Sequence, residues 1–500
     1  MAKLLIRTAT CNLDIELNEG ENIALALLRA KVDMPYACGG KGTCGQCSVW
    51  IDNSWQLACQ TYPKQDTTIT RFGWKEALEE NQNIISVALM ENETWADETE
   101  QQLPGQHSIA HTEPGSCIVA IDLGTTTLAA ALVERESQKV IRTATAMNSQ
   151  RRYGLDVLSR IRAAVDGYAK ELQQLVLEDV QRLIDSFRGE NVIEAVYITG
   201  NTTVEHLLLG YSCENLGCAP FRPVSLAEQN MQIGGLTATI LPGISAFVGA
   251  DIAAGMQVLG MGNSRENVLL LDLGTNGEMG LVADGKLYTT SAPAGPAFEG
   301  GNLSCGTGSV PGAISKVRIV GQRAIYGTIA QKPAVGICGT GVLELVSELL
   351  DNRIIDETGH LIEAYQSKGY PLSRKADGSP LVFTQQDIRE VQLAKAAIRG
   401  GMDMLLRQAG ITAAQIGRLY LAGGFGYYLN VSKAVRIGLI PEELADRSEA
   451  VGNTALFGCI AYGCSKEAKR QTQEICQAAD YSNLAEMSEF EQQYLQYMNF

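Results

Sequence analysis

Two stretches decide the fold of most of this chain: IVAIDLGTTTLAAALVE, residues 118–134, and VLLLDLGTNGEMGLVADG, residues 268–285. Each consists of an apolar run typical of a buried strand, the tetrapeptide Asp-Leu-Gly-Thr, and a second apolar run. We expect each stretch to form a β-hairpin with a glycine turn. Because the sequence nearly repeats itself after 150 residues, the repeat predicts a duplicated domain whose two halves close on one ligand.

The chemistry of such a hairpin indicates what the ligand is. Successive amides and threonine hydroxyls of the turn can hold phosphate oxygens, and an aspartate at the strand end can orient Mg²⁺ through its water. The hairpins therefore predict a site for a nucleotide and Mg²⁺. Its candidate residues are Asp122, Gly124, Thr125, Thr126 and Thr127 in the first copy, and Asp272, Gly274, Thr275, Asn276 and Gly277 in the second.

Four cysteines near the N-terminus form a second pattern. Cys38, Cys44 and Cys47 lie in the glycine-rich loop CGGKGTCGQC, and Cys59 follows in LACQ. Glycines let the backbone bring thiolates and amides toward one centre, and the spacing is close to that of plant-type iron–sulfur proteins. Four cysteines also bind zinc, but zinc ligands usually come as two separated pairs. The spacing therefore favours a [2Fe-2S] cluster held by all four cysteines.

Composition limits the classes of partner. The chain has 500 residues and a net charge of −16, and its Lys and Arg do not cluster as nucleic-acid binding requires. The sequence shows neither a signal peptide nor an apolar run of membrane-spanning length. We therefore expect a cytoplasmic protein of several domains that binds neither nucleic acid nor membrane, with its 13 cysteines present as thiols or ligands.

The chain divides into four expected parts: a ferredoxin-like domain over 1–76, an acidic, Gln-rich linker over 77–115, and two ATPase halves over 116–262 and 263–500. In the first part, patterning predicts strands at 3–8, 13–17, 49–51 and 67–70, and a helix over 21–30.

Two further helices are expected in the ATPase part. The apolar spacing over 152–187, with Leu155, Leu158, Ile161 and Leu172, is helical and typical of a core face. Thr384 and Asp387 match a capping box, so a second helix should begin there, with Phe383 and Ile388 as its hydrophobic staple.

Together these motifs resemble those of known families. The two hairpins resemble the phosphate-1 and phosphate-2 motifs of the superfamily of acetate and sugar kinases, heat-shock chaperone ATPases and actin. LAGGFGYYLN from Leu421 and TGNTTVEH from Thr199 resemble its hinges, and GICGTGVLELVSELL from Gly336 its adenosine motif. The resemblance implies a β-grasp ferredoxin-like domain followed by a duplicated RNase H-like ATPase domain. It also implies that Gly336, Gly339, Thr340 and Gly341 border the adenosine.

The combination of a cluster domain with this ATPase resembles the reductive activases of corrinoid proteins in methyltransferase and O-demethylase systems. The resemblance implies an ATP-hydrolysing enzyme that passes one electron from the cluster to an inactive Co(II) corrinoid and restores Co(I). Its expected partners are a corrinoid protein and an upstream electron donor, and a homodimer stays open. The residue that positions the hydrolytic water is undecided among Asp251, Asn201 and Glu278.

Other function classes stay open at this stage. The chain could be an ATP-driven electron donor of the kind that activates 2-hydroxyacyl-CoA dehydratases, or a small-molecule kinase with a redox domain. It could also be a nucleotide switch of the chaperone kind. ATP turnover that depends on a corrinoid partner would separate the activase from these alternatives.

Overall fold

The computed structural model describes residues 2–8, 12–18, 20–30, 32, 47–51, 54–72, 116–189, 192–375 and 378–500. Cys38 and Cys44, and the expected linker, lie outside these residues. Among the helices described, none combines the length and the apolar character needed to cross a membrane.

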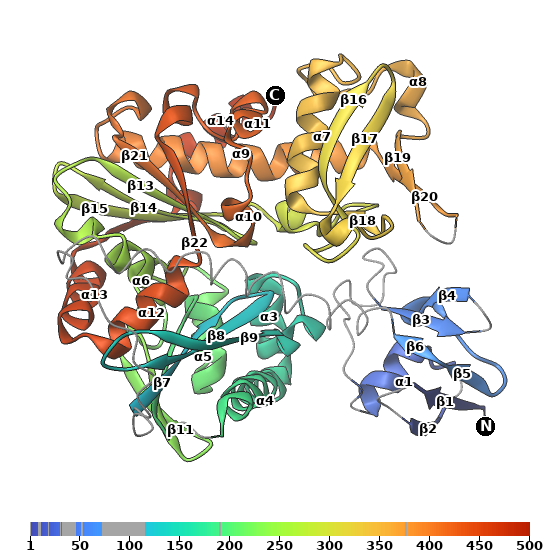
Figure 1. Ribbon diagram of the computed structural model, residues 1–500, viewed down its shortest axis with the longest axis horizontal. Helices are drawn as coiled ribbons and strands as arrows, with labels where there is room; N and C mark the ends of the chain where they lie inside the picture. Colours follow the sequence, from blue (N-terminus) through green and yellow to red (C-terminus); the bar gives the residue numbers. More distant parts are fainter. Residues whose placement is uncertain are drawn as a thin grey trace, which may run out of the picture.

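The N-terminal domain is built from two small sheets, as the ferredoxin-like prediction requires (Figure 1). One has the order β2-β1-β5 and the other β4-β3-β6. A short helix packs into the same apolar core, and its N-cap Asn22 accepts a hydrogen bond from the Leu25 N–H. The elements are β1 (Lys3–Arg7), β2 (Asn12–Glu16), α1 (Ile23–Arg29), β3 (Ser48–Ile51), β4 (Ser54–Leu57), β5 (Thr67–Ile69) and β6 (Arg71–Phe72).

The first ATPase half contains a six-stranded sheet of order β11-β12-β10-β7-β8-β9. Its strands are β7 (Ser116–Leu123), β8 (Thr127–Glu134), β9 (Val140–Met147), β10 (Val192–Gly200), β11 (Gln229–Ile233) and β12 (Leu236–Ile240). Its helices are α3 (Val157–Ala163), α4 (Ala169–Phe187), α5 (Thr202–Leu209) and α6 (Ala250–Val258).

The second half repeats this arrangement in a sheet of order β22-β21-β13-β14-β15-β23. Its strands are β13 (Val268–Leu273), β14 (Gly277–Ala283), β15 (Lys286–Ala292), β21 (Arg418–Ala422), β22 (Ser448–Gly452) and β23 (Asp480–Ser482). In each sheet an antiparallel meander of three strands is extended by two parallel strands. The duplication predicted from the two hairpins is therefore present in the topology.

The second half also carries an insertion, at the upper right of Figure 1. It contains β16 (Ala313–Val320), β17 (Arg323–Thr328), β18 (Gly336–Ile337), β19 (Tyr370–Arg374), β20 (Pro380–Phe383), α7 (Gly339–Asp351) and α8 (Glu363–Gln366). The remaining helices of this half are α9 (Gln385–Gln408), α10 (Gly423–Tyr427), α11 (Val431–Arg436), α12 (Thr454–Cys464), α13 (Lys466–Ala478) and α14 (Ser488–Gln496).

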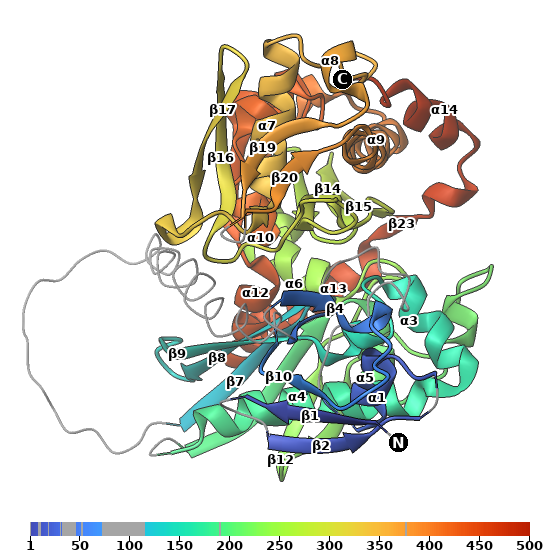
Figure 2. The same cartoon turned by 90° about the vertical axis from the view of Figure 1, so that its right-hand side faces the viewer.

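The long helix α9 begins as its capping pattern predicts. Thr384 and Asp387 form a complete capping box, and Phe383 and Ile388 are both fully buried in one core. Reciprocal capping satisfies amides that the first turn leaves without a helical partner. The helix therefore lies at a fixed place on one face of the second sheet, against β14 and β15 (Figure 2).

The helix expected over 152–187 is broken, which corrects the sequence interpretation. Gly167 has φ of +106°, and a π-helical turn over Ala164–Tyr168 separates α3 from α4. Leu158, expected in the core, is 54% exposed. The buried face of α3 follows Val157, Arg160 and Ile161, and position 158 lies outside that stripe.

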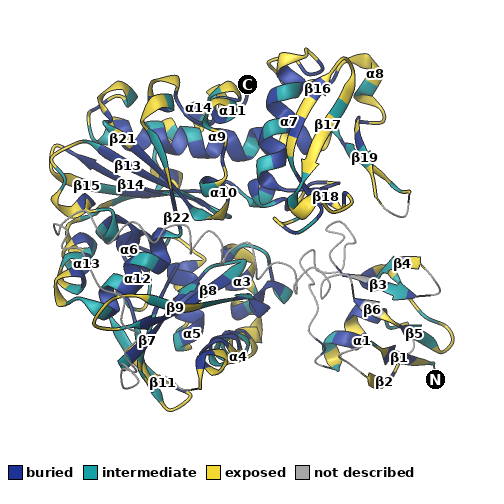
Figure 3. Ribbon diagram, in the orientation of Figure 1, coloured by how far each residue is buried: buried dark blue, intermediate teal, exposed yellow. Residues whose placement is uncertain are grey.

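Helices α6 and α12 join the two halves. In Figure 1 they lie between the two sheets, and the strands beside them are buried (Figure 3). Helix α6, which precedes the second half in sequence, packs on β13, whereas α12 packs on β7 and β8 of the first half. They cross closely, since a Cβ on Gly458 would stand 2.1 Å from the Ala254 carbonyl oxygen. The halves are thus interlocked by exchanged helices, and the boundary at 262/263 stays a prediction.

Candidate nucleotide and cluster sites

A cavity of about 350 Å³ lies between the two ATPase halves. The two hairpin aspartates occupy equivalent positions in the two sheets. Asp122 of β7 pairs with Thr199 of the parallel strand β10, and Asp272 of β13 pairs with Ala422 of the parallel strand β21. The three candidates for the water-positioning residue also line the cavity. The predicted residues that line it are Asp122, Gly124, Thr125, Thr126, Thr127, Asn201, Asp251, Asp272, Gly274, Thr275, Asn276, Glu278 and Gly339.

Four predicted residues, Gly277, Gly336, Thr340 and Gly341, are not among the residues that line the cavity, and their part in nucleotide binding stays a prediction. Packing requires a glycine at positions 277 and 341. A Cβ at position 277 would stand 2.8 Å from the Ile398 side chain, and one at position 341 would stand 2.0 Å from the Ile314 carbonyl oxygen. Gly336 likewise packs against Thr307, and Thr340 lies in the first turn of α7. The glycine turn before α7 therefore serves mainly to seat that helix.

A further part of the cavity wall comes from α10 and from the residue that follows it. Gly423, Gly424, Phe425, Tyr427 and Tyr428 line it. Gly423 has φ of +82°, and a Cβ there would stand 2.6 Å from Asp272 Oδ1. A glycine at position 423 therefore lets α10 start directly beside the hairpin aspartate.

Three glycines leave room that the protein does not fill. A Cβ on Gly308 or Gly424 would meet nothing within 4 Å, and one on Gly274 would meet no atom closer than 3.9 Å. All three line the cavity. Their missing side chains therefore leave an open cradle in the cavity wall, with room for phosphate groups to approach the backbone closely.

Five partly buried carboxyl groups line the cavity: Asp122, Asp251, Asp272, Glu278 and Glu299. Burial raises the pKa of Asp122 to about 7, that of Asp251 to about 6 and that of Asp272 to about 8. Burial, with the charges of Asp251 and Asp272, also raises the pKa of Glu278 well above its ordinary value. Such a set attracts a cation. Since no three His, Cys, Asp or Glu side chains among the described residues are grouped to bind a metal directly, a cation here would need water and phosphate ligands.

We expect Asp272→Asn to become more stabilising as pH rises. Folding raises the pKa of Asp272 from 3.8 to about 8, so between these pH values the folded state keeps a proton that the unfolded state has released. The free energy of unfolding of the wild type therefore falls as pH rises from 3.8 to about 8. Asn keeps the neutral state. Without nucleotide or Mg²⁺, the free energy of unfolding of the variant relative to wild type should rise by ~1–3 kcal/mol from pH 5.5 to pH 8. Urea unfolding measures it, and a pH-independent difference would contradict the buried charge.

Sequence reasoning missed several residues of the site. Asn453, at the N-terminus of α12, donates a hydrogen bond to Asp122 Oδ2 at 2.9 Å. Glu299, in the turn after β15, accepts hydrogen bonds from the hydroxyls of Thr126 and Thr275. The segments SAPAGPAFEGG and LAGGFGYYLN carry clustered glycines and aromatic residues, but nothing in them shows which side chains face the hairpins.

Asn201 has a structural part in the site. Its Oδ1 caps α5 by accepting from the Val204 N–H at 3.0 Å, and its Nδ2 donates to Thr125 Oγ1 at 2.9 Å. Both ends of the amide are therefore occupied in holding the first hairpin against α5. Asp251 and Glu278 remain the stronger candidates for positioning water.

The described part of the cluster site contains two of the four cysteines. Cys47 and Cys59 are 2% and 1% exposed and lie in one apolar core. The Ala58 N–H donates to the Cys47 carbonyl at 2.9 Å, beside the paired residues Ser48 and Leu57, so both cysteines lie at the same end of the β3–β4 hairpin. Two cysteines at one end of a hairpin, both shielded from water, fit half of a [2Fe-2S] ligand set.

Three family models match successive parts of the chain. Residues 10–64 match a 2Fe-2S iron-sulfur cluster binding domain, residues 117–264 the RACo middle region, and residues 266–500 the C-terminal domain of RACo, its ASKHA domain. Fold and site thus define an iron–sulfur protein with a nucleotide-binding domain of the ASKHA class.

Individual relatives cover most of the chain. The corrinoid activation enzyme RamQ of Eubacterium limosum is 29% identical over 75% of this chain and 69% of its own length. The [Co(II) methylated amine-specific corrinoid protein] reductase of Methanosarcina barkeri is 26% identical over 68% of each. A solved reductive activator for corrinoid, iron-sulfur protein superposes on the whole chain and on 98% of its own, with a TM-score of 0.71 and 26% identity. The chain belongs to this RACo family of reductive activases.

Proposed function

We propose that this protein is an ATP-hydrolysing activase that passes one electron from its [2Fe-2S] cluster to a Co(II) corrinoid protein and restores Co(I). The observation that carries the proposal is the presence on one chain of a cluster-binding domain and a duplicated nucleotide site. The activities for which the RamQ, Methanosarcina barkeri and solved-activator relatives are named support the corrinoid as acceptor. The cluster, when bound, supplies a one-electron carrier.

We infer that Mg-ATP lies across the cavity. The hairpin segments 124–127 and 274–276 hold the phosphates, and Asp122 and Asp272 hold Mg²⁺ through its water. The adenosine lies against the α10 segment, residues 423–428, because this segment lines the cavity whereas Gly336, Thr340 and Gly341 do not. Asp251 and Glu278 are the proposed partners of the hydrolytic water.

Nucleotide binding can drive an unfavourable electron transfer only if ATP binds two conformations with different affinity. The exchanged helices α6 and α12 connect the halves that contact the two ends of the nucleotide. A change in closure at the hairpins is thereby transmitted to the opposite half. We propose that this movement changes the grip on the corrinoid protein and so lowers the barrier to reduction.

An upstream electron donor reduces the cluster, and the protein works in the cytoplasm. A homodimer is a hypothesis that light scattering of the purified protein would test.

The proposed function predicts ATP-dependent formation of Co(I). Reduced protein, Mg-ATP and a Co(II) corrinoid protein should together yield the Co(I) absorption band, and omission of ATP should stop the reaction although the cluster stays reduced. Removal of residues 1–76 should preserve nucleotide binding but end electron delivery. Reduction by the truncated chain at the full rate would refute the electron path. Failure of every corrinoid protein tested, together with a phosphorylated product in a screen with labelled ATP, would favour a kinase.

A further inference from the structure

Glu299 connects the two phosphate hairpins through one oxygen atom. Its Oε2 accepts a hydrogen bond from the Thr126 hydroxyl at 3.2 Å and another from the Thr275 hydroxyl at 2.9 Å. Thr126 belongs to the hairpin of the first half and Thr275 to that of the second. We call this arrangement the Glu299 bridge.

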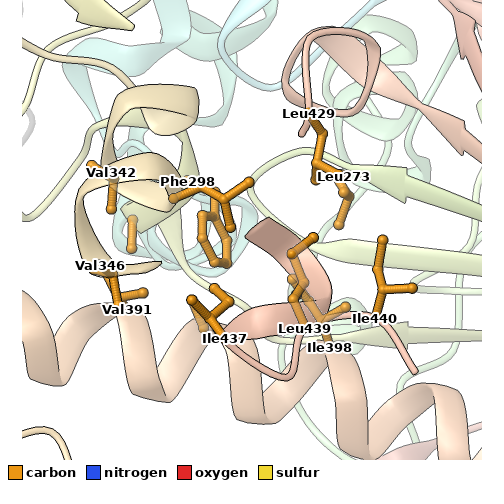
Figure 4. Close-up of a cluster of buried hydrophobic side chains, with 14 of the residues drawn as sticks. Leu273, Phe298, Val342, Val346, Val391, Ile398, Leu429, Ile437, Leu439 and Ile440 are labelled. Carbon is orange, nitrogen blue, oxygen red and sulfur yellow. The ribbon is translucent and has the colours of Figure 1, made fainter. Parts of the chain in front are cut away.

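The bridge is anchored in the second half. Glu299 ends a 3₁₀ turn, Pro296–Glu299, and the adjacent Phe298 is buried in the core of that half among Val342 and Val346 (Figure 4). Phe298 also stacks on Phe425 of α10, with ring centroids 4.9 Å apart. The glycine after the turn, Gly300, has φ of +76°, and a Cβ there would stand 2.0 Å from the Thr307 carbonyl oxygen. The bond to Thr126 therefore reaches across from a fixed turn to the opposite half.

The bridge and a phosphate group need the same donors. A hydroxyl has one proton to donate, so a threonine that donates to Glu299 cannot donate to a phosphate oxygen at the same time. A carboxylate and a phosphate also repel each other in a buried site. Burial raises the pKa of Asp272, and the negative charges of Asp251, Asp122 and Glu299 add to that effect. Phosphate at this point must displace the carboxylate.

The phosphate in question is the terminal one. The adenosine surface proposed above, residues 423–428, belongs to the second half, and Phe298 joins it to the turn that carries Glu299. The hydroxyls of both halves meet at Glu299 Oε2. A phosphate held by both hairpins is the one that extends farthest from adenosine toward the first half. A diphosphate leaves this position to the carboxylate.

We propose that Glu299 is a specificity-determining positioning residue whose carboxylate competes with the terminal phosphate of ATP for the hydroxyls of Thr126 and Thr275. ATP must release the Glu299 bridge, whereas ADP leaves it in place. With ADP bound, the two halves are joined through Glu299, and with ATP bound they are not. The inference rests on the proposed nucleotide site and adds the residue that gives ATP and ADP different effects on closure.

The test is the affinity of Glu299→Gln for the two nucleotides, measured by calorimetry with Mg²⁺. Glutamine keeps the length of the side chain and an acceptor oxygen but removes the charge, so its bonds to the threonines are weaker and easier to displace. We expect a non-hydrolysable ATP analogue to bind about tenfold more tightly than to the wild type, and ADP to change less than about threefold. Equal changes for both nucleotides, or weaker binding of the ATP analogue, would overturn the proposal.

Glu205→Gln is the matched control. It makes the same change at a buried carboxyl group of α5 that does not line the cavity, and the hydroxyl protons of Thr126 and Thr275 stay committed to Glu299, so the bridge remains. The ratio of ATP to ADP affinity should shift less than about threefold in this variant. A ratio shift as large as that of Glu299→Gln would mean that the loss of any buried carboxyl group of the ATPase domain has the same effect, and would overturn the bridge.

Circular dichroism checks that Glu299→Gln is folded. If it is not, Glu299→Asp gives the answer, because the shorter carboxylate cannot reach both hydroxyls and should also raise the ATP-to-ADP affinity ratio, whereas an unchanged ratio would overturn the bridge. A wild-type chain that binds neither nucleotide would refute the proposed nucleotide site and the bridge together. Nucleotide binding by the wild type, with no selective response in the variants, would overturn the bridge alone.

Discussion

Replacing Cys59 with alanine is expected to abolish electron transfer to the corrinoid while ATP hydrolysis continues. Cys59 lies 1% exposed in the N-terminal core, on the 3₁₀ turn after β4, and the N-cap Asn22 donates to its carbonyl at 3.0 Å. Loss of this thiolate removes one proposed ligand, so the iron content should fall from two per chain to nearly none. We expect the rate of Co(I) formation to fall by more than about 100-fold, and the rate of ATP hydrolysis to change less than about twofold.

Cys218→Ala is the control for this experiment. Cys218 is exposed in the first ATPase half and lies outside the predicted ligand set, so its loss should leave iron, sulfide and the visible spectrum unchanged. Zinc at one equivalent in the wild-type protein, without visible absorption, would refute the iron–sulfur assignment. Full iron content in Cys59→Ala would refute the place of Cys59 among the ligands.

Both the fold and the hairpin half of the site could be predicted from sequence because they depend on local patterns. An apolar strand followed by Asp-Leu-Gly-Thr specifies its own turn, and its recurrence at Asp272 indicates the second half. The capping box of α9 is also complete within four residues, Thr384–Asp387. In these elements, local chemistry and tertiary structure agree.

The other side of the cavity could not be predicted because it is decided by packing over long sequence separations. Two segments, GICGTG and LAGGFG, both place glycines before a helix. In the first, Gly341 is required by the nearby Ile314 carbonyl, whereas in the second, Gly423 is required by Asp272 itself. A local pattern cannot distinguish a glycine that seats a helix from one that borders a ligand.

Glu299 and Asn453 illustrate the same limit. Glu299 acts on Thr126, which is 173 residues away, and Asn453 on Asp122, which is 331 residues away. Neither contact has a sequence spacing that a motif could record. The failure at Leu158 is different, because the buried face of α3 follows Val157, Arg160 and Ile161 and leaves position 158 on the exposed side, although the residue is apolar.

Replacing Asp122 or Asp272 with alanine is expected to remove Mg-ATP turnover and leave the cluster spectrum intact. Both carboxyl groups lie partly buried at equivalent strand ends in the two hairpins, and both line the cavity. A carboxylate that holds the water shell of Mg²⁺ contributes where charge develops during phosphoryl transfer, so its loss should reduce the rate by about 100-fold or more. Hydrolysis of labelled ATP measures the effect, and the visible spectrum reports the separate N-terminal domain.

Asp179→Asn separates loss of the site from loss of the fold. Asp179 is fully buried in the first half, where it accepts hydrogen bonds from Ser149 and pairs with Arg182, but it does not line the cavity. Its substitution should lower the melting temperature and preserve the rate of ATP turnover of the folded protein. Alanine at 122 or 272 should instead preserve or raise the melting temperature and lower the rate of ATP turnover. The melting temperature should not fall, because the substitution removes a carboxyl group whose burial is costly while it is ionised. If both alanine variants hydrolyse ATP at the wild-type rate, the phosphates and Mg²⁺ are not bound between these hairpins.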